Sequence, residues 1–246
     1  GHHQQHQNQQ NHKKASHAAP SPKAMRETYQ AASLLPFGCC VIWLRKAICA
    51  PRPKLTTDSA MPPYSELLIT DRLVLRPYLP EDEAYVIAMG QDPLTMRHYP
   101  ALQTPAQSQA MMASAGLHWA RHGFATLAVT RRSDGAFLGM CGCKTLDWPH
   151  TLPGNVEVGW RFMPAAWGQG YATEAARAAL RHGFQVSTLP MILSFTVAAN
   201  KPSWSVMERL GLTRRPELDF DHPRVPDGHP LKRHIVYVAE RERFAG

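Results

Sequence analysis

Runs of alternating apolar and polar residues follow one another along residues 61–246, separated by stretches with helical spacing. Leu73 and Leu75 alternate with Arg72 and Arg76, which predicts a half-buried first strand at residues 67–76. Runs rich in β-branched and aromatic residues predict further strands at residues 124–131, 136–144, 155–163, 191–197, 212–219 and 231–240.

Apolar positions three and four residues apart predict helices between these strands. The clearest stripe begins at Ala172 and ends at Phe184, directly after the strand at residues 155–163. Other helices are expected at residues 80–89, 104–121 and 201–210, with a short further piece beginning at Asp92 and Pro93. This order predicts an α+β fold: a mixed, mostly antiparallel central sheet of about six to seven strands with helices on both faces.

The turn between residues 163 and 171 joins the strand at 155–163 to the clearest helix. Gly168 and Gly170 stand at the helix entrance, where glycine permits positive φ and close approach of a ligand to the main chain. The first amides of a helix lack internal partners and attract phosphate. The turn is therefore a candidate site for a phosphorylated cofactor, although two glycines are equally typical of an ordinary left-handed turn.

The residues around this turn resemble the acetyl-CoA motif of the GNAT N-acetyltransferases, in the branch that includes the ribosomal-protein N-acetyltransferases RimJ and RimL. The family pattern Arg/Gln-x-x-Gly-x-Gly/Ala falls on residues 167–172, with Trp167 in place of the usual Arg or Gln. A second segment, residues 200–212, resembles the Asn-x-x-Ser…Leu-Gly-Phe segment of that branch. The resemblance implies the GNAT fold, acetyl-CoA as co-substrate, no metal, and acetylation of a protein N-terminal amine or a small-molecule amine.

The resemblance also implies which residues hold the cofactor. These residues are Phe162, Met163, Trp167, Gly168, Gln169, Gly170, Tyr171, Ala172, Thr173 and Asn200. Main-chain groups of Phe162 and Met163 would bind the pantetheine amides as an added strand does, and one amide there would serve the oxyanion. Asn200 would contact the pantetheine arm, or instead cap its own helix.

Acetyl transfer from a thioester to an amine needs a group that removes a proton, because an ammonium has no lone pair. Glu157 matches the Glu of the family's Glu-x-Gly-Tyr/Trp segment and is the expected base, directly or through water. Its alternative role is an ion pair with a nearby arginine such as Arg161. Ser203 is expected to donate to the leaving thiolate, or else to satisfy free helix amides.

Several other residues are candidates whose alternative role is packing or surface exposure. They are Arg97, His98 and Tyr99 for acceptor contact, and His222, His229 and His234 as bases. Trp148 and Trp204 are expected in the core or in a pocket wall. A non-catalytic CoA-binding module with a role in sensing or assembly is the alternative to an enzyme.

The net charge of +8 arises mostly outside the expected domain. Residues 1–60 hold eight Lys or Arg and two Asp or Glu, so only +2 remains for residues 61–246. We therefore expect no nucleic-acid partner. Cys141 and Cys143 alternate along a strand without metal-ligand spacing to other residues, which favours small strand residues in a reducing, cytoplasmic setting.

Residues 1–60 are expected to form a disordered or low-complexity extension, and residues 61–246 the acetyltransferase domain. Residues 1–14 are mainly His, Gln and Asn, a composition that cannot bury apolar surface. The apolar run at residues 34–48 contains Arg45 and Lys46 and is shorter than a membrane span of about 18–20 residues, so no membrane association is expected. Met61 is a candidate native start, and the protein is expected to be a monomer or homodimer.

Overall fold

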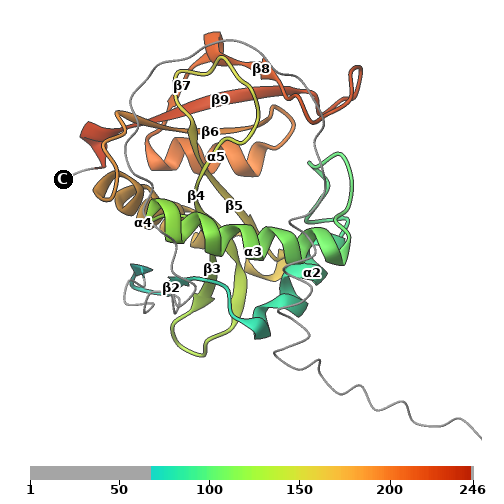
Figure 1. Ribbon diagram of the computed structural model, residues 1–246, viewed down its shortest axis with the longest axis vertical. Coiled ribbons are helices and arrows are strands. Elements are labelled where there is room, and N and C mark those ends of the chain that lie inside the picture. The colour runs from blue at the N-terminus through green and yellow to red at the C-terminus, as the bar shows by residue number, and fades with distance from the viewer. Residues whose placement is uncertain (1–67, 245–246) are drawn as a thin grey trace, which may run out of the picture. The chain divides into compact units, whose positions relative to one another are not determined.

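The computed structural model describes residues 68–244, so the expectations for residues 1–60 lie outside the described residues. Its strands are β1 (Leu68–Ile69), β2 (Leu73–Arg76), β3 (Thr126–Arg131), β4 (Phe137–Thr145), β5 (Val156–Phe162), β6 (Met191–Val197), β7 (Thr213–Arg214), β8 (Phe220–Asp221) and β9 (Arg233–Glu240). They form one sheet in the order β1-β2-β3-β4-β5-β6-β9-β7, with β8 also paired to β9 (Figure 1). Among the strands of residues 68–244 only β5 and β6 run parallel, which confirms a mixed, mostly antiparallel sheet. The described residues form nine strands, whereas six to seven were expected. Three of the nine, β1, β7 and β8, have only two residues each.

The prediction of one strand over residues 67–76 is wrong, because a turn divides it into β1 and β2. Thr70 makes that turn: its hydroxyl accepts a hydrogen bond from the amide of Leu73 at 3.0 Å, and its own amide donates to Leu73 O at 3.0 Å. The strand predicted at residues 212–219 is likewise shortened to β7. It gives way to a 3₁₀ turn at Pro216–Leu218, since Pro216 has no amide to extend a ladder.

The α-helices of the described residues are α2 (Glu83–Gln91), α3 (Pro105–His122), α4 (Tyr171–Gln185) and α5 (Lys201–Leu210). Thr104 caps α3, because its hydroxyl accepts from the amide of Gln107 while the Gln107 side chain accepts from the amide of Thr104. The short piece expected at Asp92 and Pro93 is a series of turns and not a helix. None of the helices in residues 68–244 is long and apolar enough to cross a membrane.

Helices cover both faces of the sheet, as predicted, and Figure 1 shows α3 crossing in front of it. On one face α4 packs closely on β4, where a side chain at Gly183 would lie 3.1 Å from Cys143 Sγ. Cys141 and Cys143 are buried there as strand residues, and burial raises the pKa of Cys143 to about 12, so the thiol stays protonated. On the other face α2 and α3 cover Met140.

The sheet is weakly joined between β5 and β6, and this seam positions the site. A single residue pair, Glu157 with Leu193, connects the two strands, and the hydroxyl of Ser194 then donates to Val158 O at 3.0 Å. Along a strand of an antiparallel pair, the main-chain N–H and C=O groups of successive residues point to opposite sides. The Met163 amide points to β4, where it donates to Leu138 O, so the main-chain groups of Trp160 and Phe162 point towards β6. Beyond the single pair, β5 therefore presents main-chain groups that no strand satisfies.

Candidate active site

The turn before α4 has the backbone geometry expected of an anion site. Gly168 and Gly170 adopt φ of +74° and +80°, and Gly170 caps α4 without a side-chain hydrogen bond. No hydrogen bond to another described residue engages the amides of residues 168–173. These amides lie at the positive end of the α4 dipole, so the turn can bind phosphate oxygens.

A cavity of about 700 Å³, here called the first cavity, extends from this turn. Its walls include eight of the ten predicted cofactor residues: Phe162, Trp167, Gly168, Gly170, Tyr171, Ala172, Thr173 and Asn200. Gln169 and Met163 do not line it. The Gln169 side chain donates to Ala165 O, and the Met163 amide donates to Leu138 O at 3.0 Å. Trp160, which sequence reasoning missed, lines the cavity and presents the main-chain groups that were expected of Met163.

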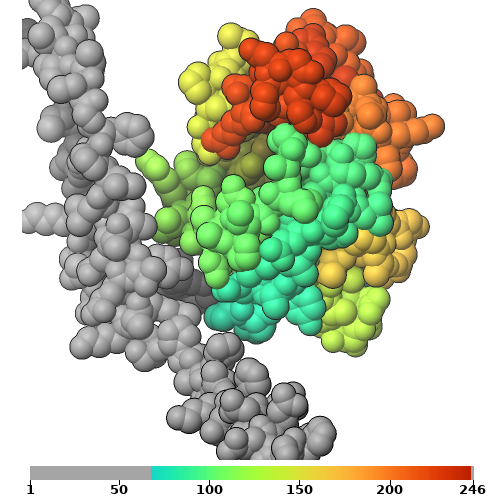
Figure 2. All heavy atoms as spheres, turned by 90° about the vertical axis from the view of Figure 1, so that its right-hand side faces the viewer, coloured from blue at the N-terminus to red at the C-terminus, as the bar shows by residue number. Residues whose placement is uncertain are grey.

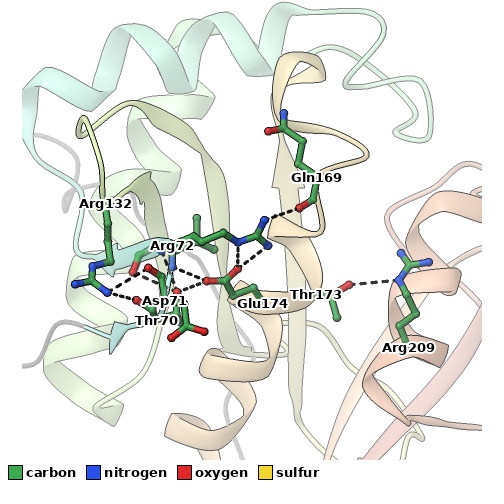
Figure 3. Close-up of polar contacts among 9 residues, drawn as sticks. Thr70, Asp71, Arg72, Arg132, Gln169, Thr173, Glu174 and Arg209 are labelled. Carbon is green, nitrogen blue, oxygen red and sulfur yellow. Dashed lines mark hydrogen bonds and ion pairs between the residues drawn. The ribbon is translucent and has the colours of Figure 1, made fainter.

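The first cavity is lined by four cationic side chains and by no carboxylate among the described residues. The cations are Arg97, Arg161, Lys201 and Arg209. The Arg209 side chain donates to Thr173 Oγ1 at 3.4 Å, beside the glycine turn (Figure 3). Lys201 and Arg209 were missed, although their spacing of eight residues places both on one face of α5. Such walls suit a ligand with several phosphate groups.

Glu174 fixes the glycine turn to the first hairpin of the sheet. Its carboxylate accepts from Thr70 Oγ1 at 2.6 Å, from the Arg72 amide at 2.9 Å and from Arg72 Nε at 2.7 Å. The Arg72 guanidinium also donates to Gln169 O at 2.9 Å, and Figure 3 shows these contacts converging. The β1–β2 turn, about a hundred residues earlier in the chain, thereby sets the position of the anion site.

Replacing Glu174 by glutamine is expected to lower the free energy of unfolding by about 1–3 kcal/mol at pH 7. Burial alone would raise the pKa of Glu174, but the hydrogen bonds from Thr70 and Arg72 outweigh it and hold the pKa below its ordinary 4.5. The stabilisation is therefore complete above pH 4.5 and is lost as the pH falls through the lower folded pKa. Urea unfolding at neutral and acidic pH measures both effects.

Glu217→Gln is the matched control, because Glu217 pairs with Arg215 at 2.6 Å where both side chains are exposed. Such a pair contributes about 0–1 kcal/mol. Equal losses in the two variants at pH 7 would contradict the anchoring role of Glu174.

A second cavity of about 890 Å³ opens on the other side of the seam. Its floor includes Glu157, Gly159 and Arg161 of β5, and its walls come from α3, the segment before α3 and the β8–β9 region. Figure 2 shows the corresponding recess between the orange-red surface of the C-terminal strands and the green surface of α3 and the preceding segment. The residues that line both cavities are His98, Tyr99, Trp160, Arg161, Asn200 and Ser203.

Glu157 is only 8% exposed and lies opposite Lys144 in the β4–β5 ladder. Lys144 Nζ is 3.1 Å from Glu157 Oε1. Burial raises the pKa of Glu157, and the positive charge of Lys144 opposes this rise. Arg161, the alternative ion-pair partner considered from the sequence, donates instead to Gln103 Oε1 at 2.8 Å. Glu157 thus combines the burial and the cavity access that a proton acceptor requires.

Asn200 and Ser203 stand at the start of α5, between the two cavities. The Asn200 side chain makes no capping bond and donates to Thr196 Oγ1 at 2.9 Å, so the alternative capping role is wrong. The Ser203 hydroxyl forms no hydrogen bond with another described residue, and α5 has no side-chain cap. The Ser203 hydroxyl and the Asn200 amide oxygen are therefore available to a ligand that spans the seam.

Of the three candidate histidine bases, His222 and His234 line the second cavity and His229 does not. His222 Nδ1 accepts from the Arg224 amide at 3.2 Å, so the proton of the neutral ring lies on Nε2. Burial and the neighbouring His234 and Arg224 lower the pKa of His222 to about 4, so the ring is neutral at pH 7. With one nitrogen engaged and the other protonated, His222 serves as part of the wall.

The remaining candidates, Arg97, Trp148 and Trp204, lie in a cavity wall or against the core. Arg97 lies over the Trp167 ring, with 4.9 Å between the guanidinium carbon and the ring centroid. Trp148 lines the second cavity. Trp204 is partly buried against the main core, and its indole donates to Ala198 O at 3.0 Å.

Comparison with known proteins identifies the family. The family model described as "Acetyltransferase (GNAT) domain" matches residues 72–213. The uncharacterized protein YkkB of Bacillus subtilis is 30% identical over 148 residues, which cover 59% of this chain and 84% of YkkB.

Solved acetyltransferases share the fold. An acetyltransferase from Agrobacterium tumefaciens gives a TM-score of 0.58 at 23% identity and covers 80% of this chain and 99% of its own. RimJ of Mycobacterium smegmatis, solved in complex with CoA-disulfide, gives 0.54 at 20% identity over 71% of this chain and 84% of its own. Because the family model spans more than half of the sequence, this chain belongs to the GNAT acetyltransferases, which confirms the N-acetyltransferase enzyme predicted from its two motifs.

Proposed function

We propose that this protein moves the acetyl group of acetyl-CoA to a primary amine by direct attack within a ternary complex. The observation that carries the proposal is the meeting of two unlike cavities at the β5–β6 seam. The first has cations and free amides and no carboxylate among the described residues, and the second holds the buried carboxylate of Glu157. A polyphosphate cofactor suits the first cavity, and an amine that must lose a proton suits the second.

In the first cavity the free amides of residues 168–173 bind the diphosphate of the cofactor, and Arg97, Lys201 and Arg209 neutralise phosphate charge. The carbonyl of Trp160 and the amide of Phe162 bind the pantetheine arm as an added strand would. The Phe162 carbonyl is already occupied, because it accepts from Trp167 Nε1 at 2.8 Å.

In the second cavity Glu157 accepts a proton from the acceptor ammonium, directly or through water. The amine nitrogen then attacks the thioester carbonyl carbon, and a strand amide such as that of Trp160 stabilises the oxyanion. The carbon–sulfur bond breaks, and the proton that the new amide nitrogen loses passes through the Ser203 hydroxyl to the leaving thiolate. The products are an acetylated amine and the free thiol of CoA.

The proposal is tested by mixing the full chain with acetyl-CoA and a panel of peptide N-termini and small-molecule amines. Release of free thiol and a matching rise in the mass of one amine are the expected results. Calorimetric binding of CoA without thiol release for any amine would favour a non-catalytic CoA-binding module. No heat with CoA or acetyl-CoA would overturn cofactor binding itself.

A further inference from the structure

The charged side chains of the second cavity do not balance. Glu157 pairs with Lys144 at 3.1 Å, and Asp147 pairs with Arg224 at 2.9 Å. Arg161 is the fifth charged residue in the wall, and no carboxylate of the described residues lies within ion-pair distance of it. The cavity thus carries one positive charge in excess, provided by Arg161.

Arg161 is partly buried and has weak partners. Its Nη1 donates to Gln103 Oε1 at 2.8 Å and lies 3.1 Å from Met96 Sδ, and its Nη2 lies 3.9 Å from Met111 Sδ. The Nε atom is buried without a hydrogen-bond partner among the described residues. A guanidinium offers five donors and thioethers are weak acceptors, so this cation lacks the counter-ion that burial normally requires.

Within residues 68–244 the rest of the wall supplies no free carboxylate. The indole N–H of Trp148 is also buried without a hydrogen-bond partner among the described residues. Burial lowers the pKa values of His98 and His234, as it does for His222, so these rings are neutral at pH 7. Such a cavity repels a polycationic amine and attracts a ligand that carries negatively charged oxygen atoms.

The floor of the cavity separates the base from the unpaired cation. Glu157, Gly159 and Arg161 point to the same face of β5, because alternate residues of a strand share a face. The Cα atoms of Glu157 and Arg161 are about 13 Å apart at 3.3 Å per residue. A side chain at Gly159 would meet no atom within 4 Å, so the space between the two charges is open.

We propose that the amine acceptor also carries a carboxylate, which Arg161 binds while the amine lies at Glu157. The body of the acceptor lies over Gly159, against a wall that includes Tyr99, Trp148 and Phe195. This inference rests on the proposed acetyl transfer and names the chemical class of its acceptor. Arg161 determines acceptor specificity and takes no part in proton transfer.

Amine pairs that differ only in the carboxylate test the inference. 6-Aminohexanoate is compared with pentylamine, and 4-(aminomethyl)benzoate with benzylamine, by thiol release at saturating acetyl-CoA. We expect the acid of at least one pair to have the higher kcat/KM. Arg161→Gln is expected to lower that value about 10- to 100-fold, mainly through KM, as for a lost hydrogen bond to a charged group. The carboxylate-free amines should change by less than about threefold, within ordinary variation of a contact energy.

Control variants separate specificity from structure. Arg161→Lys should restore part of the preference for the acid, because it keeps the charge but loses the planar donors. Arg181→Gln removes an exposed arginine of α4 that lines neither cavity and should leave every kcat/KM unchanged. Arg161 also lines the first cavity, so calorimetry with CoA checks its part in cofactor binding, and we expect the affinity of Arg161→Gln to stay within about threefold of the wild type.

Three results would overturn the inference while leaving acetyl transfer intact. The wild type could acetylate the carboxylate-free amines as well as the acids, or Arg161→Gln could lower both members of a pair equally. Arg161→Gln could also weaken CoA binding without changing the ratio between acid and amine, which would assign Arg161 to the cofactor. If no amine of the panel releases thiol, the binding of each acid and its matched amine to the CoA complex is measured instead. Equal binding of the two, or no binding of either, would also overturn the inference. Failure of the wild type to bind CoA would instead refute the proposed function.

Discussion

Replacing Glu157 by glutamine is expected to lower kcat about 10²- to 10⁴-fold, the range that a positioned general base contributes. Glutamine keeps the size of the side chain and its hydrogen-bonding capacity in the buried floor of the second cavity, but it cannot accept a proton. Cofactor affinity should be retained, because Glu157 does not line the first cavity. Steady-state thiol release and calorimetry with CoA measure the two quantities, and unchanged turnover would exclude Glu157 as the base.

The pH dependence of kcat/KM is a second test of Glu157 as the base. The ionised carboxylate is the active form, so activity falls as the pH drops through the folded pKa of Glu157. Lys144 lowers that pKa against the effect of burial, so Lys144→Met should raise it and move the acid limb of kcat/KM to higher pH. A limb that moves to lower pH, or stays in place, would contradict the assignment. The double variant with Glu157→Gln should show no such limb.

Replacing Gly170 by valine is expected to weaken CoA binding by at least about 100-fold. Gly170 has φ of +80°, where a residue with a Cβ is strained by about 1–2 kcal/mol and a β-branched residue by more. Relief of that strain moves the amides of the α4 entrance, and each lost bond to a charged phosphate costs about 1.5–3 kcal/mol. A free-energy loss of about 1.4 kcal/mol lowers the affinity tenfold, so the loss of two such phosphate bonds lowers it by about 100-fold. Calorimetry with CoA measures the loss.

Gly211→Val is the matched control for that variant. Gly211 has φ of +81° at the C-terminal cap of α5 and lines neither cavity. Both substitutions should lower the thermal midpoint through the same backbone strain, whereas only Gly170→Val should lose cofactor. Equal CoA affinity in the two variants would show that the amides at the α4 entrance do not hold the diphosphate.

Local features of this molecule could be predicted from the sequence because each depends on a few consecutive residues. The strand at residues 191–197 and the helix at residues 201–210 have the predicted bounds. The glycine at position 211 ends that helix in the left-handed conformation. The division of β1 from β2 was missed because one threonine hydroxyl decides it, against an otherwise regular alternation.

Partnerships in the site could not be predicted, because they depend on register and on distant segments. Lys144 meets Glu157 only because the β4–β5 ladder pairs those two positions and not their neighbours. Arg161 bonds to Gln103, 58 residues earlier, and Arg209 to Thr173, 36 residues earlier. Spacing along the chain therefore indicated the residue types of the site, while the identity of each partner required the folded arrangement.

The position of β9 in the sheet has a consequence for how the molecule matures during synthesis. This strand pairs with β6, β7 and β8, and it follows all the other described strands in the sequence. The ribosome releases residues in order, so the glycine turn and Glu157 emerge well before the strand that supports the β8–β9 wall. A nascent chain therefore contains every residue that lines the first cavity before it contains His234, the last residue that lines the second cavity.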